Sequence, residues 1–266
     1  MEDMSNSARS TSAIFRRGGD RVNVPACGAL LAVFILGLYL LLSRMEYGWN
    51  WRVPWEYRSL YMLGLYYTLV TSAAAGCLGY LLGLAGGIAR ICGNSFAREA
   101  ARLYVILFRG TPLLIQIYIF YFCLAPAIGW DSPPATGVIV LAAFSGAYIT
   151  EIVRAGIESV DRGQAEAALS TGLTTWQSFR YVIFPQAFRR IVAPVTGQFV
   201  SLIKDSSLLS VISVRELTKA SEVVNATTYK TFEAYLPLAL LYLALTWPLS
   251  HLTLALEKKL RKSDGA

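Results

Sequence analysis

The sequence predicts an all-α integral membrane protein with about six transmembrane helices. The chain of 266 residues is 55% hydrophobic and only 15% charged, and its mean hydropathy is +0.47. Soluble domains carry about a quarter charged residues. The apolar residues gather in long runs without a charge, and about 20 such residues let a helix cross a bilayer. The basic residues gather between these runs.

Five charge-free runs are long enough to span a bilayer. They are Val22–Ser43, Ser59–Ala89, Gly110–Trp130, Ser132–Thr150 and Ala234–Leu256. A sixth apolar run, Ile191–Val214, is interrupted only by Lys204 and Asp205. Six spans account for most of the chain and leave little of it for a soluble domain.

The two ends of the chain are polar. Residues 1–21 are rich in serine and arginine, and we expect a disordered cytoplasmic tail there. Residues 257–266 are expected to form a basic cytoplasmic tail. The apolar run 22–43 is long and is not followed by a small-x-small cleavage site, so we interpret it as a retained N-terminal span and not as a signal peptide.

The distribution of basic residues predicts the orientation of the spans. With six spans, both termini lie on one side, and that side holds 16 basic residues against 6 on the other. The larger set is Arg9, Arg16, Arg17, Arg21, Arg90, Arg98, Arg102, Arg154, Arg162, Arg180, Arg189, Arg190, Lys258, Lys259, Arg261 and Lys262, and the smaller set is Arg44, Arg52, Arg58, Arg215, Lys219 and Lys230. Cytoplasmic loops carry an excess of lysine and arginine, so we expect both termini in the cytoplasm.

The second span carries three glycines at intervals of four residues, at Gly79, Gly83 and Gly87. Residues four apart share one face of a helix, and small residues there let a second helix approach closely. Two interpretations are open, namely packing within the chain and a seam between two copies of it.

The sequence offers no pattern typical of an enzyme site or a metal site. The four cysteines and the single histidine lack the spacing of metal ligands, and we expect the cysteines to be buried as small apolar residues. The glycines of the second span lack the Gly-Lys-Ser/Thr ending of a nucleotide-binding loop. The net charge of +7 arises in the short connections, which argues against a nucleic-acid partner. We therefore expect no catalytic residues and no cofactor.

The long segment between the fourth and fifth spans contains signals for two short helices. Gln164–Thr171 consists of good helix formers, and Gly172 is suited to the left-handed conformation that ends a helix. Thr174 is followed three residues later by Gln177, which is the spacing of a capping box. Pro185 then breaks or restarts the path before the fifth span.

This segment, 158–190, resembles the EAA loop of permease subunits of ABC importers. The matching residues are Glu166, Ala167 and Ala168, then Gly172, then Val182, Phe184 and Pro185. Three further stretches resemble the polar amino-acid branch of that family. They are Leu107–Gln116, Ala147–Ile157 and Ser201–Leu209.

The resemblance implies a five-helix permease core of the type I importer fold over residues 59–256, with the span 22–43 as an addition. It also implies the partners: a second permease subunit, cytoplasmic ATPase subunits that dock on Glu166, Ala167, Ala168, Gly172 and Pro185, and an extracytoplasmic binding protein that delivers a polar or charged amino acid. The membrane would be the bacterial inner membrane, and ATP would be hydrolysed by a separate chain. The alternative is an ion-coupled secondary amino-acid transporter, which would need coupling carboxylates in several spans.

The polar interruption of the fifth span is the first candidate for the substrate path. Ionisable groups at bilayer depth are costly and face a protein interior or a cavity. Asp205 is suited to accept hydrogen bonds from a substrate ammonium, and Lys204 or free backbone N–H groups to hold its carboxylate. The hydroxyls of Ser206 and Ser207 are suited to bond freed backbone groups. The other interpretation is a structural Lys–Asp pair that ties neighbouring helices together.

Two other polar positions admit both structural and gating roles. Thr111 and Pro112 are expected to open the third span, with Arg109 reaching an interface or bonding freed carbonyl groups. Glu151 and Arg154, three residues apart, are expected to pair on one face of the fourth span.

Overall fold

A computed structural model describes residues 46–262 and short pieces of the preceding chain, at 28–30, 32–33, 36–37, 39–40 and 43–44. The chain separates into two units, Met1–Trp49 and Asn50–Ala266. The described pieces from 28 to 40 are helical and are followed by a turn at Ser43 and Arg44. The expected tail 1–21, and much of the expected span 22–43, lie outside the described residues.

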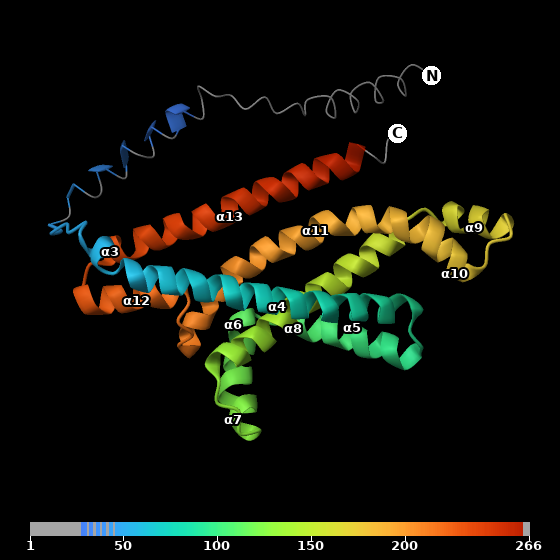
Figure 1. Cartoon of the computed structure of the whole chain (residues 1–266), viewed down its shortest axis with the longest axis horizontal. Helices are drawn as coiled ribbons and strands as arrows, with labels where there is room; N and C mark the ends of the chain where they lie inside the picture. The colour runs from blue at the N-terminus through green and yellow to red at the C-terminus, as the bar shows by residue number, and fades with distance from the viewer. Residues whose placement is uncertain are drawn as a thin grey trace, which may run out of the picture. The chain divides into compact units, whose positions relative to one another are not determined.

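The second unit is built from helices, and no strand occurs in the part of the chain that the structure describes (Figure 1). The α-helices are α3 (Val53–Glu56), α4 (Arg58–Cys92), α5 (Ser95–Gly110), α6 (Leu113–Tyr118), α7 (Ala125–Ala127), α8 (Pro133–Glu158), α9 (Arg162–Ser170), α10 (Thr175–Ser178), α11 (Phe184–Asp205), α12 (Leu217–Thr228) and α13 (Thr231–Lys262). Two π-helical turns, η1 (Ile119–Leu124) and η2 (Phe179–Ile183), and one 3₁₀ helix, η3 (Ser206–Ile212), connect them. The all-α membrane fold expected from the sequence is confirmed.

Among the described residues, three helices are long and apolar enough to cross a membrane, namely α4, α8 and residues 231–260 of α13. A fourth crossing is possible if α5 and the helices after it form one broken span. Helix α11 is not in this set, because it carries two arginines near its start and Lys204 and Asp205 at its end.

Helices α4 and α8 form the closest helix pair of the second unit. A Cβ atom added at each of the three spaced glycines of α4 would lie 2.1 to 2.5 Å from a side-chain atom of α8. The pairs are Gly79 with Ser145, Gly83 with Ile149 and Gly87 with Val153. Real Cβ atoms do not approach so closely, so the glycines permit this contact. Of the two interpretations open from the sequence, the structure shows packing within the chain.

The third expected span, Gly110–Trp130, is helical from Leu113 to Ala127, and the opening expected at Thr111 and Pro112 is present. Helix α5 begins at Ser95 and ends at Gly110, and the chain then bends by 106° into the helices that start at Leu113. The cause is local, because Pro112 has no N–H to donate and disfavours helical backbone at the residue before it. The charges of α5, at Arg98, Glu99 and Arg102, had excluded this helix from the apolar run.

The fifth expected span, Ile191–Val214, is shifted. Helix α11 begins at Phe184, with Pro185 in its first turn, and ends at Asp205. It is continued by the 3₁₀ helix η3, which ends at Ile212 and is followed by Ser213 with φ of 62°. Proline is tolerated in the first turn of a helix because the N–H groups there have no partner within the helix. The backbone stays helical from η2 through Pro185 into α11, so the expectation that Pro185 breaks or restarts the path was wrong.

Two smaller expectations are corrected. Cys77, Cys92 and Cys123 are exposed in the single chain, where burial was expected, because they lie on helix faces that no other described element covers. Helix α13 continues to Lys262, so the expected basic tail 257–266 begins as helix. Its last residues, 263–266, lie outside the described part.

Candidate functional site

The break between α5 and α6 is held by a side chain that the sequence reasoning did not single out. Gln116 is buried on α6, and its Nε2 donates to the carbonyl oxygen of Phe108 at 2.8 Å and to that of Thr111 at 3.1 Å. The same Nε2 lies 2.9 Å from Thr111 Oγ1, and Thr111 in turn donates to Leu107 O at 2.8 Å. Carbonyl groups freed by the break are thus satisfied locally, as a membrane interior requires.

Arg109 does not bond these freed carbonyl groups. Its guanidinium carbon lies 4.9 Å from the centre of the Tyr148 ring on α8, which is the geometry of a cation–π contact. From the sequence we expected Arg109 either to reach an interface or to bond freed carbonyl groups. Its observed contact, with an aromatic ring, is neither of these. The contact nevertheless ties the end of α5 to α8.

The polar residues at the end of α11 lie at a second break. Lys204 and Asp205 are the last residues of the α-helix, Lys204 is exposed, and Asp205 is half-buried. No ion pair joins them to each other or to any other residue that the structure describes. Ser206 is buried and donates to the carbonyl oxygen of Ile203 at 2.7 Å, while Ser207 is half-buried in η3.

The two breaks pack against one hydrophobic cluster. Leu113 and Ile117 follow the first break, Leu202 precedes the second, and Leu209 and Ile212 follow it. All five are buried together with residues of α4 and α8. The candidate path residues of α5 and α11 are therefore anchored to a common core. No hydrogen bond or ion pair joins Arg109 or Thr111 to positions 204–207 in the described structure.

The segment between α8 and α11 forms the helix–turn–helix that the sequence predicted. Helix α9 ends before Gly172, which has φ of 87°, and the N–H of Leu173 reaches back to Ala168 O at 3.3 Å. Thr174 and Gln177 form the capping box, with the Thr174 N–H donating to Gln177 Oε1 at 2.9 Å. The π-helical turn η2 then leads into α11 (Figure 1).

This segment presents both polar and apolar groups to its surroundings. Glu166 and Ala167 are exposed on α9, whereas Ala168 is buried against the rest of the segment. Trp176 and Tyr181 are 69% and 67% exposed, which is unusual for large aromatic side chains. Among Ala165, Ala167 and Ala168, which we had expected to form a small-residue surface for a partner, Ala167 is exposed, Ala165 is half-buried and Ala168 is buried.

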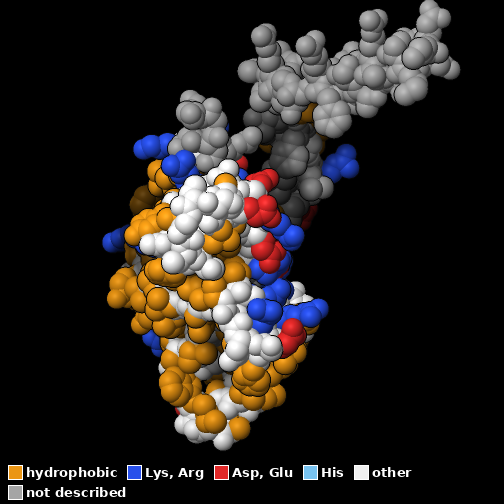
Figure 2. Space-filling view, turned by 90° about the vertical axis from the view of Figure 1, so that its right-hand side faces the viewer, with side chains coloured by type: hydrophobic (Ala, Val, Ile, Leu, Met, Phe, Trp, Pro, Cys, Tyr) orange, Lys and Arg blue, Asp and Glu red, His pale blue; other side chains and the backbone are white. Residues whose placement is uncertain are grey.

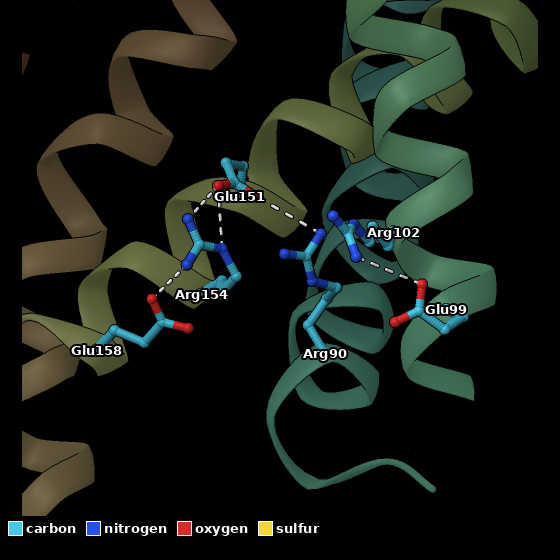
Figure 3. Close-up of polar contacts among 6 residues, drawn as sticks. All are labelled: Arg90, Glu99, Arg102, Glu151, Arg154 and Glu158. Atoms are coloured by element: carbon cyan, nitrogen blue, oxygen red, sulfur yellow. Dashed lines mark hydrogen bonds and ion pairs between the residues drawn. The ribbon is translucent and has the colours of Figure 1, made fainter. Parts of the chain in front are cut away.

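A cluster of ion pairs lies at the ends of α4, α5 and α8 (Figure 3). The expected pair of Glu151 with Arg154 is present, and Arg154 also pairs with Glu158 one turn later. Glu151 in addition faces Arg90 of α4 at 4.0 Å. The cluster therefore links α4 to α8 close to the start of the segment 158–190, called the coupling segment below after the loop that it resembles. The sequence indicated only the pair within α8.

A buried polar group on the other side of the core was also missed. Glu216 caps α12, accepting the N–H groups of Thr218 and Lys219 at 2.7 Å each. Tyr242 of α13 donates its hydroxyl to the same carboxylate at 3.0 Å, and Thr68 of α4 accepts the N–H of Leu217 at 3.1 Å. The only sequence signal was an acidic residue directly before a helical stretch, which suits an N-cap. The network joins α4, α12 and α13.

Comparison with known proteins places these features in one family. The family described as "Binding-protein-dependent transport system inner membrane component" matches residues 75–262, which include the first break, the coupling segment and the second break. The chain belongs to this family. Its matched region covers α8 and α11 in full, together with both candidate path segments.

Named proteins align with the chain over most of their own length. A probable glutamine ABC transporter permease protein, GlnM of Bacillus subtilis (strain 168), is 39% identical over 206 residues, which is 77% of this chain and 95% of the relative. The glutamine transport system permease protein GlnP of Escherichia coli (strain K12) is 35% identical over 214 residues, which is 80% of this chain and 98% of the relative.

The fold also matches solved structures. A chain of a crystal structure of an amino acid ABC transporter with histidines aligns with a TM-score of 0.76 and 34% identity, covering 80% of this chain and 100% of that one. An inward-facing MetNI methionine ABC transporter aligns with a TM-score of 0.59 at 18% identity, which supports the fold alone. The likeness in sequence and fold makes the chain a multi-pass membrane permease of ABC importer type.

Proposed function

We propose that the chain is the membrane-spanning permease subunit of an ATP-driven importer for a polar amino acid, with glutamine as the first candidate. The observation that carries the proposal is the exposed helix–turn–helix 158–190, set in a chain of the inner-membrane component family. Both relatives described above are named as glutamine permeases, which supports glutamine as the substrate. These names also favour an ABC importer over an ion-coupled secondary transporter.

The ATPase contact is assigned to the coupling segment. Glu166 and Ala167 are exposed on α9, Gly172 fixes the turn, and the aromatic side chains of Trp176 and Tyr181 are large exposed anchors. Aromatic residues of this kind contribute strongly to protein interfaces. The chain itself has no nucleotide-binding loop, so ATP would be hydrolysed on separate cytoplasmic subunits.

The substrate path is assigned to the two helix breaks. Discontinuous helices place free backbone groups and polar side chains at the depth where transporters bind substrate. Asp205 makes no ion pair within the described residues and is half-buried, so its carboxylate is available for a substrate ammonium. Lys204, Ser206 and Ser207 border the same break, and Arg109 and Thr111 border the other.

The orientation follows from the basic residues. The coupling segment and both termini are assigned to the cytoplasm, and the extracytoplasmic side would receive the substrate from a binding protein. The relatives account for about four-fifths of this chain and nearly all of their own length. This supports the segment 22–43 as an N-terminal addition to the five-helix core, and the two ends, 1–21 and 257–266, as cytoplasmic tails. A second permease subunit, identical or related, would complete the path.

Purification of the intact complex from its own membrane tests the proposal. We expect the ATPase subunits to co-purify with the chain, and the amino acid retained in the complex, identified by mass spectrometry, to be glutamine or another polar amino acid. A chain that purifies without an ATPase subunit, even under mild detergent conditions, would contradict the importer assignment. A different retained amino acid would change the substrate while leaving the importer assignment intact.

A further inference from the structure

The ends of α4, α5 and α8 enclose a cleft that the proposed transport function does not use. Its volume is about 460 Å3. It is lined by Arg90, Ile91, Arg98, Glu99, Arg102, Arg154 and Glu158. Figure 2 looks at this end of the molecule and shows basic and acidic side chains gathered together beside a broad hydrophobic surface.

The cleft carries an excess of positive charge. The lining holds four arginines and two glutamates, and a third glutamate, Glu151, pairs with Arg90 and Arg154 beside it, which leaves an excess of one positive charge. Arg154 is neutralised by Glu151 and Glu158, and Arg102 lies 3.7 Å from Glu99 with both side chains largely exposed. Exposed pairs of this kind contribute little to stability. They leave Arg102 open to a stronger anion.

Of the four arginines that line the cleft, Arg98 has the fewest polar partners among the described residues. No acidic side chain lies within ion-pairing distance of it in the described part of the chain, and its one hydrogen bond is to the carbonyl oxygen of Gly93 at 3.4 Å. Arg98 and Arg102 stand four residues apart, so they lie one above the other on the same face of α5. Two guanidinium groups on one face, beside a cleft, suit a phosphate group.

Exposed apolar side chains follow the arginines along α5. Ile106 stands four residues after Arg102 and is 56% exposed, and Leu103 is 57% exposed. At 100° per residue, Ile106 lies about 40° round the helix from Arg102, whereas Phe96 and Leu107 lie roughly 120–180° from the two arginines, on another face. The line of Arg98, Arg102 and Ile106 thus runs from a charged cleft near the helix start to an apolar side chain.

We infer that this cleft binds the headgroup of an anionic phospholipid from the cytoplasmic leaflet. The phosphate lies between Arg98 and Arg102, with Arg90, which also faces Glu151 at 4.0 Å, behind it, and the acyl chains pass along Ile106. Basic pockets between transmembrane helices on the cytoplasmic side are suited to such headgroups. The inference depends on the cytoplasmic orientation proposed above, but not on the substrate or on transport.

Native mass spectrometry of the detergent-purified complex, titrated with phosphatidylglycerol or with zwitterionic phosphatidylethanolamine, tests the inference. We expect preferential retention of phosphatidylglycerol. In the double variant Arg98→Gln, Arg102→Gln, retention should fall about tenfold or more, because one hydrogen bond to a charged group contributes about as much as a tenfold change in affinity. The matched control Lys258→Gln, Lys259→Gln removes equal charge from exposed residues near the end of α13 and should retain the lipid.

A variant that is expected to increase lipid retention distinguishes a specific loss of binding from misfolding. Glu99→Gln removes an acidic group from the cleft and should increase phosphatidylglycerol retention. Equal retention of both lipids by the wild type, or wild-type retention by the Arg98/Arg102 variant, would overturn the inference. Full displacement of the lipid by millimolar inorganic phosphate would identify a site for small anions instead. Loss of the ATPase subunits with lipid retention unchanged would identify a protein contact. Each of these results would overturn the lipid assignment without bearing on transport.

Discussion

Gln116 on α6 donates its side-chain N–H to the carbonyl oxygen of Phe108 on α5, across the 106° break at Thr111 and Pro112. The bond spans eight residues and links the two halves of a broken helix. It shows how a carbonyl group freed by a proline-induced break finds a hydrogen-bond donor within the chain.

Replacing Gln116 with methionine, which is similar in volume but has no N–H group, removes this bond. We expect the detergent-purified chain to lose roughly 1–3 kcal/mol of stability, because the carbonyl groups of Phe108 and Thr111 lose the partner that the buried Gln116 provides. A thermal-shift measurement detects the change. Gln164→Leu is the control, since Gln164 is exposed and makes only a 3.4 Å contact with Gln186. Equal melting temperatures for the two variants would show that the bond is dispensable.

The contact between α4 and α8 depends on the absence of side chains on α4. Gly83→Ala would place a Cβ atom 2.4 Å from Cβ of Ile149, and overpacking of this kind costs about 1–3 kcal/mol. We expect a lower melting temperature and reduced yield. Gly110→Ala meets nothing within 4 Å and serves as the control. If both variants behave alike, the glycine contact is not a determinant of stability.

The turn of the coupling segment depends on Gly172. We expect Gly172→Asp to leave the chain inserted in the membrane but to detach or uncouple the ATPase subunits. A non-glycine residue at φ of 87° is strained by about 1–2 kcal/mol, and the added charge must fit a close interface. Gly172→Asn is the matched control, because asparagine tolerates this conformation better and adds no charge. The measurement is the amount of ATPase that co-purifies with the chain, divided by the amount of the chain present in the membrane. Normal association in the aspartate variant would contradict the docking assignment.

Much of the fold was predictable because it follows from local rules. The capping box of Thr174 with Gln177 and the left-handed Gly172 each depend on a few adjacent residues, and both are present as expected. The pairing of Glu151 with Arg154 depends on helix periodicity and is likewise confirmed.

The features that the sequence did not indicate depend on a bend, on contacts between separate helices, or on a helix whose apolar face is interrupted by charge. Gln116 was missed because its importance arises from a bend whose angle no local pattern specifies. The capping role of Glu216 was missed because Tyr242 reaches it from another helix. Helix α5 was missed because it is amphipathic and its charged face interrupted the apolar run.

One substitution at Asp205 distinguishes a role in substrate binding from a purely structural role. Asp205→Asn keeps the size and the ability to accept a hydrogen bond but loses the negative charge, and charge-assisted bonds are about twice as strong as neutral ones. We expect uptake to fall much more than complex assembly. Uptake is measured in vesicles with the binding protein present and is normalised to assembled complex. Wild-type uptake would exclude a required charge, and a loss that parallels reduced assembly would indicate a structural residue.

The dependence of transport on ATP tests the central claim most directly. The chain is reconstituted in vesicles either alone or with its ATPase subunits, and uptake of labelled glutamine is followed with the binding protein outside and ATP enclosed. We predict accumulation only with the ATPase subunits, enclosed ATP and the binding protein all present, and none by the isolated chain under a proton or sodium gradient. Accumulation by the isolated chain, driven by an ion gradient and unaffected by ATP, would contradict the assignment as an importer permease and support a secondary transporter.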